Sequence, residues 1–168
     1  MPDQGFSHLD SLGRVHMVDV TAKEPSHRRA VARAKVHMQA ETALAVSRGA
    51  FEKGDVLAVA RVAGIQAAKR TSEIIPLCHP LRIGAVSINF RLEDSYIEVE
   101  AEVETYDRTG VEMEALTACT AAALTVYDMC KSRDRGMVIS DVALWEKTGG
   151  RSGTYRRSVS ETATRHDA

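Results

Sequence analysis

The chain has 168 residues, 44% of them hydrophobic, and a formal net charge of −1 at pH 7. This length is enough to bury one core without a second domain, and the balanced charge argues against a dedicated nucleic-acid binder, which usually carries a basic excess. The three cysteines match neither a zinc ribbon nor a disulfide framework, so we expect reduced thiols.

The chain opens without a basic segment followed by an apolar one, and no apolar run is long enough to cross a bilayer. We therefore expect a cytoplasmic protein that makes no membrane contact. The composition predicts a flexible N-terminal arm over residues 1–15, a single domain over 16–153 and a flexible tail, rich in Arg, Ser and Thr, over 154–168.

The first predicted elements are strands. A short apolar piece at 16–20 is compatible with an edge strand, and apolar residues that alternate with basic ones predict a strand over 29–38 with one basic face. Alanines, a leucine and a valine then predict a helix over 39–51.

A second helix is expected to follow a stop at Lys53-Gly54 and an N-cap at Asp55. The apolar segment 55–71 also allows a strand at 56–62 followed by a shorter helix, and we prefer the single helix. Two prolines four residues apart then forbid regular helix over 74–81, which predicts a rigid, extended connector.

The second half of the chain is predicted to hold a hairpin of strands 83–92 and 96–106 with an acidic outer face, a long helix over 110–132 and a last strand over 137–146. The order strand, helices, strand, strand, helix, strand predicts an α+β fold. We expect a ferredoxin-like antiparallel sheet with helices packed on one face, plus an extra helix.

The long helix over 110–132 carries a stripe of small residues with an acidic residue at each end. At 100° per residue, one line of the helix holds Glu114, Ala118, Ala121, Thr125 and Asp128. Such a stripe permits close approach by a ligand or a second chain. Alternatively, Glu112 and Glu114 only complement the helix dipole, and Asp128 and Lys131 form an ordinary i,i+3 pair.

The two acidic ends of this stripe lie far apart. Glu114 and Asp128 are fourteen residues apart, which at 1.5 Å per residue is about 21 Å along the axis. They cannot act on one atom from the same chain. We therefore predict a homo-oligomer in which one site takes Asp128 and Lys131 from one subunit and Glu114 from its neighbour.

Several cationic side chains lie near the ends of predicted elements, where they can converge on an anion such as a phosphate: Arg28, Lys53, Lys69 and Lys131. The alternative for each is a solvated surface charge. Asp128 and Lys131 also form a candidate acid/base couple, because a partly buried lysine can lose its proton.

His79 is held between Cys78 and Pro80, and its candidate role is a ligand contact or an acid/base group rather than an ordinary loop histidine. Together with the glutamates of the long helix it would suit a metal-dependent hydrolase. The sequence has no His-x-x-x-His or Cys-x-x-Cys clamp, so we expect no metal site.

Four segments of the chain together form a pattern that is highly specific for one protein family. They are Met17-Val-Asp-Val-Thr-Ala-Lys, Gly54-Asp-Val with Ala63-Gly-Ile-Gln-Ala-Ala-Lys-Arg-Thr, Ile75-Pro-Leu-Cys-His-Pro-Leu, and Gly110-Val-Glu-Met-Glu-Ala-Leu-Thr-Ala with Tyr127-Asp-Met-Cys-Lys. Over about residues 14 to 153 the chain resembles the cyclic pyranopterin monophosphate synthase family of molybdenum cofactor biosynthesis. The resemblance implies conversion of 3',8-cyclised dihydro-GTP, a small-molecule substrate, to cyclic pyranopterin monophosphate with release of pyrophosphate.

The resemblance also implies a ferredoxin-like homohexamer, built as a trimer of dimers with active sites at the dimer interface, that uses no cofactor. It implies a catalytic role for Asp128, and we add Lys131 and Lys53 as catalytic candidates. The implied substrate-binding residues are Arg28, Lys69, Leu77, Cys78, His79, Glu112, Met113 and Glu114. An alternative is a non-catalytic nucleotide-binding or sensory domain on the same fold, which has no need of the Asp128–Lys131 couple.

Overall fold

The computed structural model describes residues 12–51 and 53–158. Its strands are β1 (Ser26–His37), β2 (Ile83–Leu92), β3 (Tyr96–Asp107), β4 (Val138–Thr148) and β5 (Tyr155–Arg156). Its helices are α1 (Ala40–Ser47), α2 (Val56–Lys69), α3 (Thr71–Ile74) and α4 (Glu112–Cys130).

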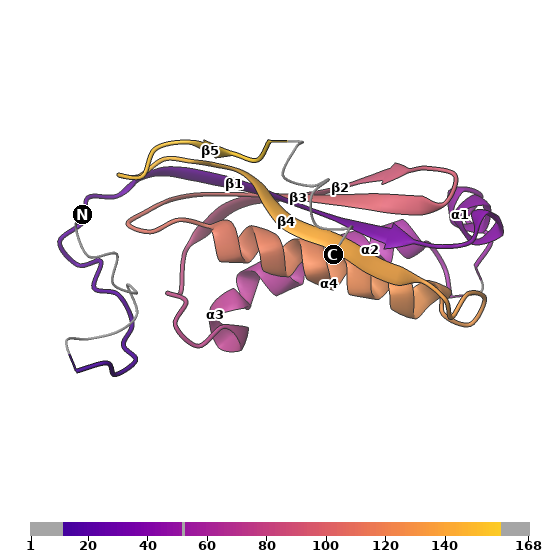
Figure 1. Ribbon diagram of the computed structural model, residues 1–168, viewed down its shortest axis with the longest axis horizontal. Coiled ribbons are helices and arrows are strands. Elements are labelled where there is room, and N and C mark those ends of the chain that lie inside the picture. Colours follow the sequence, from indigo (N-terminus) through magenta and orange to yellow (C-terminus); the bar gives the residue numbers. More distant parts are fainter. Residues whose placement is uncertain (1–11, 52, 159–168) are drawn as a thin grey trace.

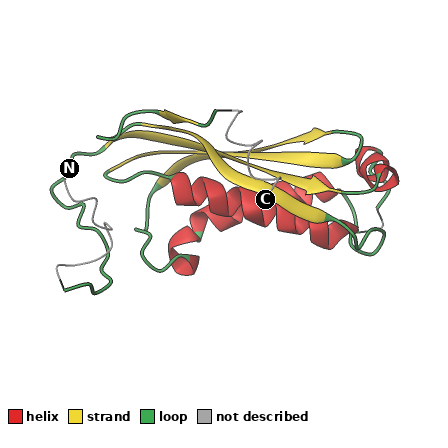
Figure 2. Ribbon diagram, in the orientation of Figure 1, coloured by secondary structure: helices red, strands yellow, loops and turns green. Residues whose placement is uncertain are grey.

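The strands form one antiparallel sheet in the order β2-β3-β1-β4-β5. Helices α2 and α4 lie side by side on one face of this sheet, and α1 lies at one end of it (Figure 1). Figure 2 shows the same two layers, with the helices on one side of the strands. The β1-helix-β2-β3-helix-β4 order confirms the predicted ferredoxin-like α+β fold.

Period-2 alternation places the two faces of β3 in different surroundings. Ile97, Val99, Ala101 and Val103 are fully buried under the helices, whereas the intervening glutamates are half-buried on the opposite face. There the glutamates meet the basic face of β1: Arg29 pairs with Glu102 and, at 2.7 Å, with Glu146 of β4, and Arg33 pairs with Glu100. The helix-free face is therefore a ladder of ion pairs rather than an apolar surface.

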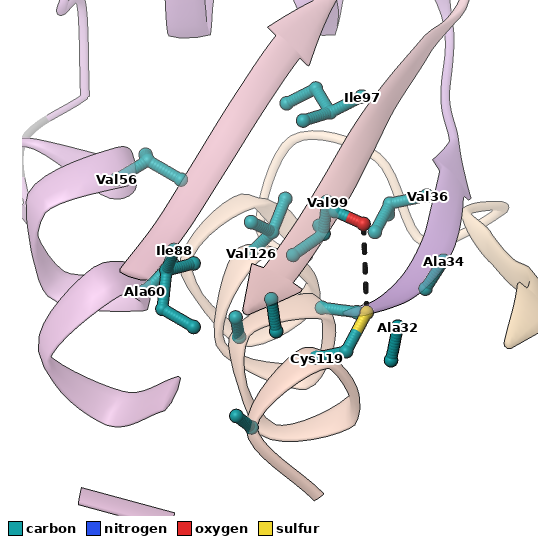
Figure 3. Close-up of a cluster of buried hydrophobic side chains, with 14 of the residues drawn as sticks. Ala32, Ala34, Val36, Val56, Ala60, Ile88, Ile97, Val99, Cys119 and Val126 are labelled. Atoms are coloured by element: carbon teal, nitrogen blue, oxygen red, sulfur yellow. Dashed lines mark hydrogen bonds between the residues drawn. The ribbon is translucent and has the colours of Figure 1, made fainter. Parts of the chain in front are cut away.

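The core lies between the sheet and the helices α2 and α4 (Figure 3). Val126 and Cys119 of α4 face Val99 and Val36, and the Cys119 thiol donates a hydrogen bond of 3.5 Å to the Val99 carbonyl. Burial raises the pKa of Cys119 to about 12, so this thiol stays protonated and inert.

The close contact between α2 and α4 depends on Gly64. A Cβ at this position would lie 3.0 Å from the Ala118 carbonyl oxygen and 3.0 Å from Ile88 Cδ1. Ala118 belongs to the small-residue stripe of α4. Part of the stripe predicted to admit a second chain is therefore occupied by α2 of the same chain.

Replacing Gly64 with valine is expected to lower the free energy of unfolding by about 1–3 kcal/mol, because the added methyl groups overpack a contact against a fixed backbone carbonyl. The control is Ala58→Val on the exposed side of the same helix, which introduces the same side chain without a packing clash. Because valine is a poorer helix former than alanine but a better one than glycine, helix propensity alone would make the Gly64 variant the less destabilised of the two. Urea unfolding of both variants measures the difference. Equal losses in the two variants would contradict the packing role of Gly64.

Most predicted elements are confirmed within a few residues. α2 begins after Asp55, whose carboxylate accepts from the Leu57 and Ala58 amides at 3.0 Å, so the alternative strand at 56–62 is wrong. The connector after α3 contains no helix or strand over 75–82.

The structure differs from the prediction in two segments near the ends of the chain. Residues 16–20 form no strand, and Val18 and Val20 line a groove. Within the segment predicted as a flexible tail, Tyr155–Arg156 form β5, paired with Glu146 and Lys147 of β4. The remainder of that tail, 159–168, and residues 1–11 of the predicted arm lie outside the described residues. None of the helices described is long and apolar enough to span a bilayer.

Candidate functional site

A groove opens at the N-terminal end of α4, where the rigid connector faces the loop before the helix. Its first cavity, of about 560 Å³, is lined by Leu77, Cys78 and His79 on one side and by Glu112 and Met113 on the other. Two prolines stiffen the connector, so these side chains are held in fixed positions. Five of the predicted substrate-binding residues are thus brought together.

Glu114 lies beneath this groove and is only 2% exposed. Its Oε1 accepts a hydrogen bond of 3.5 Å from the Cys78 thiol, and its Oε2 is buried with no partner among the described residues. Burial raises the pKa of Glu114, because the charged carboxylate is poorly solvated there. The carboxyl group therefore ties the connector to α4 and keeps one oxygen available.

Burial, followed by the charge and hydrogen bond of Glu114, raises the pKa of Cys78 to about 11. The thiolate is the reactive form, so Cys78 is not a nucleophile at neutral pH, although it lines the groove.

We expect alkylation of Cys78 by iodoacetamide to be slow at pH 8 and to rise about tenfold per pH unit until the pH approaches 11, as the thiolate fraction grows. Peptide mapping of the native protein measures this rate. The urea-unfolded chain, in which the thiol regains an ordinary pKa, is the control. Rapid labelling of native Cys78 at pH 7 would contradict the assignment.

Arg28 lines a second cavity, of about 790 Å³, which adjoins the first and shares Lys23, Thr109, Gly110 and Glu112 with it. The Arg28 guanidinium donates from Nη2 to the Arg108 carbonyl at 3.3 Å, and its buried Nε has no partner among the described residues. The structure thus places Arg28 in the same continuous groove as His79 and Glu112.

A separate polar cluster lies at the C-terminal end of α4. Lys131 Nζ donates to Asp128 Oδ1 at 2.6 Å, and Lys53 Nζ donates to the Asp128 carbonyl at 3.2 Å and lies 4.0 Å from Oδ2. The hydrogen bond and charge of Lys131, followed by the charge of Lys53, lower the pKa of Asp128. Its carboxylate is therefore ionised at neutral pH.

This cluster is more exposed to solvent than a partly buried acid/base couple would be. The side chain of Asp128 is 60% exposed and that of Lys131 is 52% exposed, so about half of each is in contact with solvent within one protomer. The i,i+3 pair predicted as the alternative is present. It lies at the other end of α4 from Glu114, about 21 Å away along the helix, so one protomer does not join the two groups.

Lys69 belongs to neither group within the protomer. It lies at the end of α2 beside a smaller cavity of about 350 Å³, which it lines with Ile65, Leu81 and Ile83. Among the residues that the structure describes, no cluster of three or more His, Cys, Asp or Glu side chains is arranged to hold a metal ion.

Two polar residues at or beside the groove, Lys23 and Asp19, are among those given no role from the sequence. Lys23 lines both cavities, and Asp19 lies close enough to His79 for their charges to interact. The hydrogen bond of the Thr21 side chain, followed by that of the Thr21 amide, which donates to Oδ1 at 2.8 Å, lowers the pKa of Asp19. Both residues belong to the segment Met17–Lys23, which is one of the four segments that carry the family resemblance. That position was the one signal in the sequence that could have indicated a role for them.

The sequence of the chain is similar to those of known proteins. The model of the MoaC family matches residues 17–150. The chain is 59% identical over 158 residues to the cyclic pyranopterin monophosphate synthase of Thermomicrobium roseum, which covers 93% of this chain and 95% of that protein. It is 56% identical over 154 residues to the protein of the same name from Heliobacterium modesticaldum, which covers 90% of this chain and 97% of that protein. The chain therefore belongs to the MoaC family.

Proposed function

We propose that the chain is a lyase that converts (8S)-3',8-cyclo-7,8-dihydroguanosine 5'-triphosphate to cyclic pyranopterin monophosphate with release of pyrophosphate, an early step of molybdenum cofactor biosynthesis. The observation that carries the proposal is the family match over residues 17–150, which spans both polar groups of α4. Relatives that bear the synthase name match nearly the whole chain at 54–59% identity.

In this proposal the groove at the start of α4 binds the purine-derived part of the substrate. Its residues offer a stiff apolar edge at Leu77, an imidazole at His79 and carboxyl groups at Glu112 and Glu114. Met113 and Cys78 complete the wall. These groups can accept and donate hydrogen bonds to ring nitrogens and exocyclic oxygens while the apolar edge excludes water.

The cluster of Lys53, Asp128 and Lys131 supplies the catalytic groups in the same proposal. Release of pyrophosphate develops negative charge, which the two ammonium groups neutralise, and ring opening and closure need a proton acceptor. The ionised carboxylate of Asp128, with two lysines within 4.0 Å, is suited to accept a proton or to orient the lysines. Arg28 and Lys69 are proposed as further substrate contacts.

A shared site requires a second subunit. We propose a homohexamer, a trimer of dimers, in which the C-terminal cluster of one α4 meets the groove of its partner. Two features support this assembly: the separation of about 21 Å between the two groups in one chain, and exposed apolar side chains on the outer side of the helices at Val59, Val62 and Leu124. We also propose a cytoplasmic location, supported by the three free thiols in the described residues.

Incubation of the purified chain with the cyclised dihydro-GTP tests the proposed activity. We expect stoichiometric release of pyrophosphate and formation of the pterin product. A phosphate-coupled assay measures the pyrophosphate, and fluorescence after oxidation measures the pterin. A parallel reaction with a chelator separates this activity from the metal-dependent hydrolase considered from the sequence. Failure to form the pterin with authentic substrate would overturn the proposal.

A further inference from the structure

Asp134 is a buried acidic residue in the turn between α4 and β4, and its side chain contacts two different parts of the chain. The residue is only 2% exposed. Its Oδ2 accepts a hydrogen bond of 2.8 Å from the Gln39 amide, and its Oδ1 accepts one of 3.0 Å from the Gly136 amide. Burial of a carboxyl group is costly unless its oxygens are hydrogen-bonded, and here both are. Asp134 therefore joins the turn after α4 to the residue that precedes α1.

The helix α1 needs such support from outside. It is eight residues long, and an isolated helix of this length is marginal in water. Its N-cap residue, Gln39, makes no side-chain capping hydrogen bond. The Asp134 carboxyl group meets a backbone amide at this end of the helix, where the helix dipole favours an acidic group. The position of α1 at the end of the sheet thus depends in part on a residue that follows α4 (Figure 1).

A second contact ties the segment after α1 to the same end of α4. Lys53 Nζ donates to the Asp128 carbonyl at 3.2 Å and lies 4.0 Å from Asp128 Oδ2. In the sequence α1 lies between Gln39 and Lys53, so each end of this segment contacts the C-terminal region of α4 or the turn that follows it. The Lys53 side chain is 47% exposed, and a flexible lysine stem can otherwise turn into solvent. A shift of α1 would therefore move Lys53 relative to Asp128.

We propose that Asp134 is a positioning residue, which holds α1 in place and thereby keeps the Lys53 ammonium beside Asp128. This proposal rests on the proposed function, in which Lys53 and Asp128 are catalytic groups of one subunit. Asp134 acts on the reaction through α1 and makes no contact with the substrate. Its effect on activity should therefore depend on Lys53, whereas a role in stability alone would not.

Steady-state kinetics with the cyclised dihydro-GTP test this role through kcat and KM separately. We expect Asp134→Ala to lower kcat by about 10–100-fold, because a misplacement of about 1 Å can cost a factor of about a hundred. KM is expected to change less than about threefold, since the groove that holds Leu77 and His79 lies at the other end of α4. Asp134→Asn keeps the shape and one acceptor oxygen, so its kcat should be intermediate and its folding better preserved.

Ile88→Val is the control for a general loss of stability. Ile88 is 2% exposed in the middle of β2, where it packs against Gly64 of α2, and the variant removes one buried methylene there. We expect a lowered thermal midpoint, as in Asp134→Asn, but a kcat within about twofold of the wild type, because the site is distant from Lys53. Equal losses of kcat in variants of equal thermal midpoint would overturn the positioning role.

The Lys53→Ala background shows whether Asp134 acts through Lys53. Once the ammonium group is removed, Asp134→Ala is expected to lower kcat by less than about a further twofold, because no lysine remains to be positioned. The same substitution lowers kcat by about 10–100-fold when Lys53 is present. Losses that multiply in the double variant would contradict the proposal, since Asp134 would then act independently of Lys53.

Labelling of Lys53 needs no turnover and therefore separates this proposal from the proposed activity. Trace acetylation of the folded full-length protein, followed by peptide mapping, measures the rate, with Lys147 in β4 as the internal reference. We expect Asp134→Ala and Asp134→Asn to raise the Lys53 rate about two- to fivefold, the weight of a partly exposed ionic contact. An unchanged rate in both variants would overturn the positioning role even if the wild type forms the pterin. A raised rate in a protein that forms no pterin would leave the positioning of Lys53 standing and the proposed activity wrong.

Discussion

Replacing Asp128 with alanine is expected to lower kcat for the cyclised dihydro-GTP by about 10²–10⁴-fold, the usual contribution of a positioned acid/base group. The carboxylate is ionised because Lys131 donates to it at 2.6 Å and Lys53 lies 4.0 Å away, so its loss removes a proton acceptor and releases both lysines. Steady-state pyrophosphate release under substrate saturation measures the effect.

The stability of this variant should hardly change. The Asp128 side chain is 60% exposed, and an ion pair of that exposure contributes little to folding. Asp94→Ala, at the exposed turn between β2 and β3, is the matched control and should keep the wild-type kcat. A kcat of Asp128→Ala equal to that of the control would remove Asp128 from the catalytic machinery.

Mixing inactive Asp128→Ala protein with inactive Glu114→Ala protein is expected to restore about a quarter of the wild-type activity, if subunits reassort randomly within dimers. The reason is that half of the dimers then contain one chain of each type, and each mixed dimer has one site with both residues intact. Glu114 and Asp128 lie at opposite ends of α4, so neither chain can complete a site alone. Activity after dissociation and reassembly of equimolar mixtures measures the recovery.

Lys53→Ala mixed with Asp128→Ala provides the control for this recovery. These two residues touch within one chain, where the Lys53 ammonium donates to the Asp128 carbonyl at 3.2 Å. Every site in a mixed dimer then lacks one of them, and no activity should return. Equal recovery in both mixtures, or none in either with confirmed subunit exchange, would exclude sites shared in the proposed way.

Most helices and strands could be predicted because the residue patterns that indicate them lie within the same short stretch of sequence. Alternation in 96–106 assigns opposite faces of β3, and the Asp55 carboxylate caps α2 through amides two and three residues ahead. The apolar piece at 16–20 and the two-residue strand β5 could not be assigned in this way. Whether such short segments meet a sheet edge or a groove is decided by partners elsewhere in the chain.

The order of elements, the rigid connector that carries Leu77, Cys78 and His79, and the distance between Glu114 and Asp128 could all be predicted from the amino-acid sequence. The reason is that proline geometry and helix rise are fixed properties of the backbone. Which side chains meet in one cavity or contact could be seen in the folded chain alone. In the fold, Gly64 of α2 packs against Ala118 and Lys69 lies outside the groove. Arg28, Arg108 and Arg151 line the same cavity. Such convergence depends on how the sheet and helices pack, and no pattern along the chain records that packing.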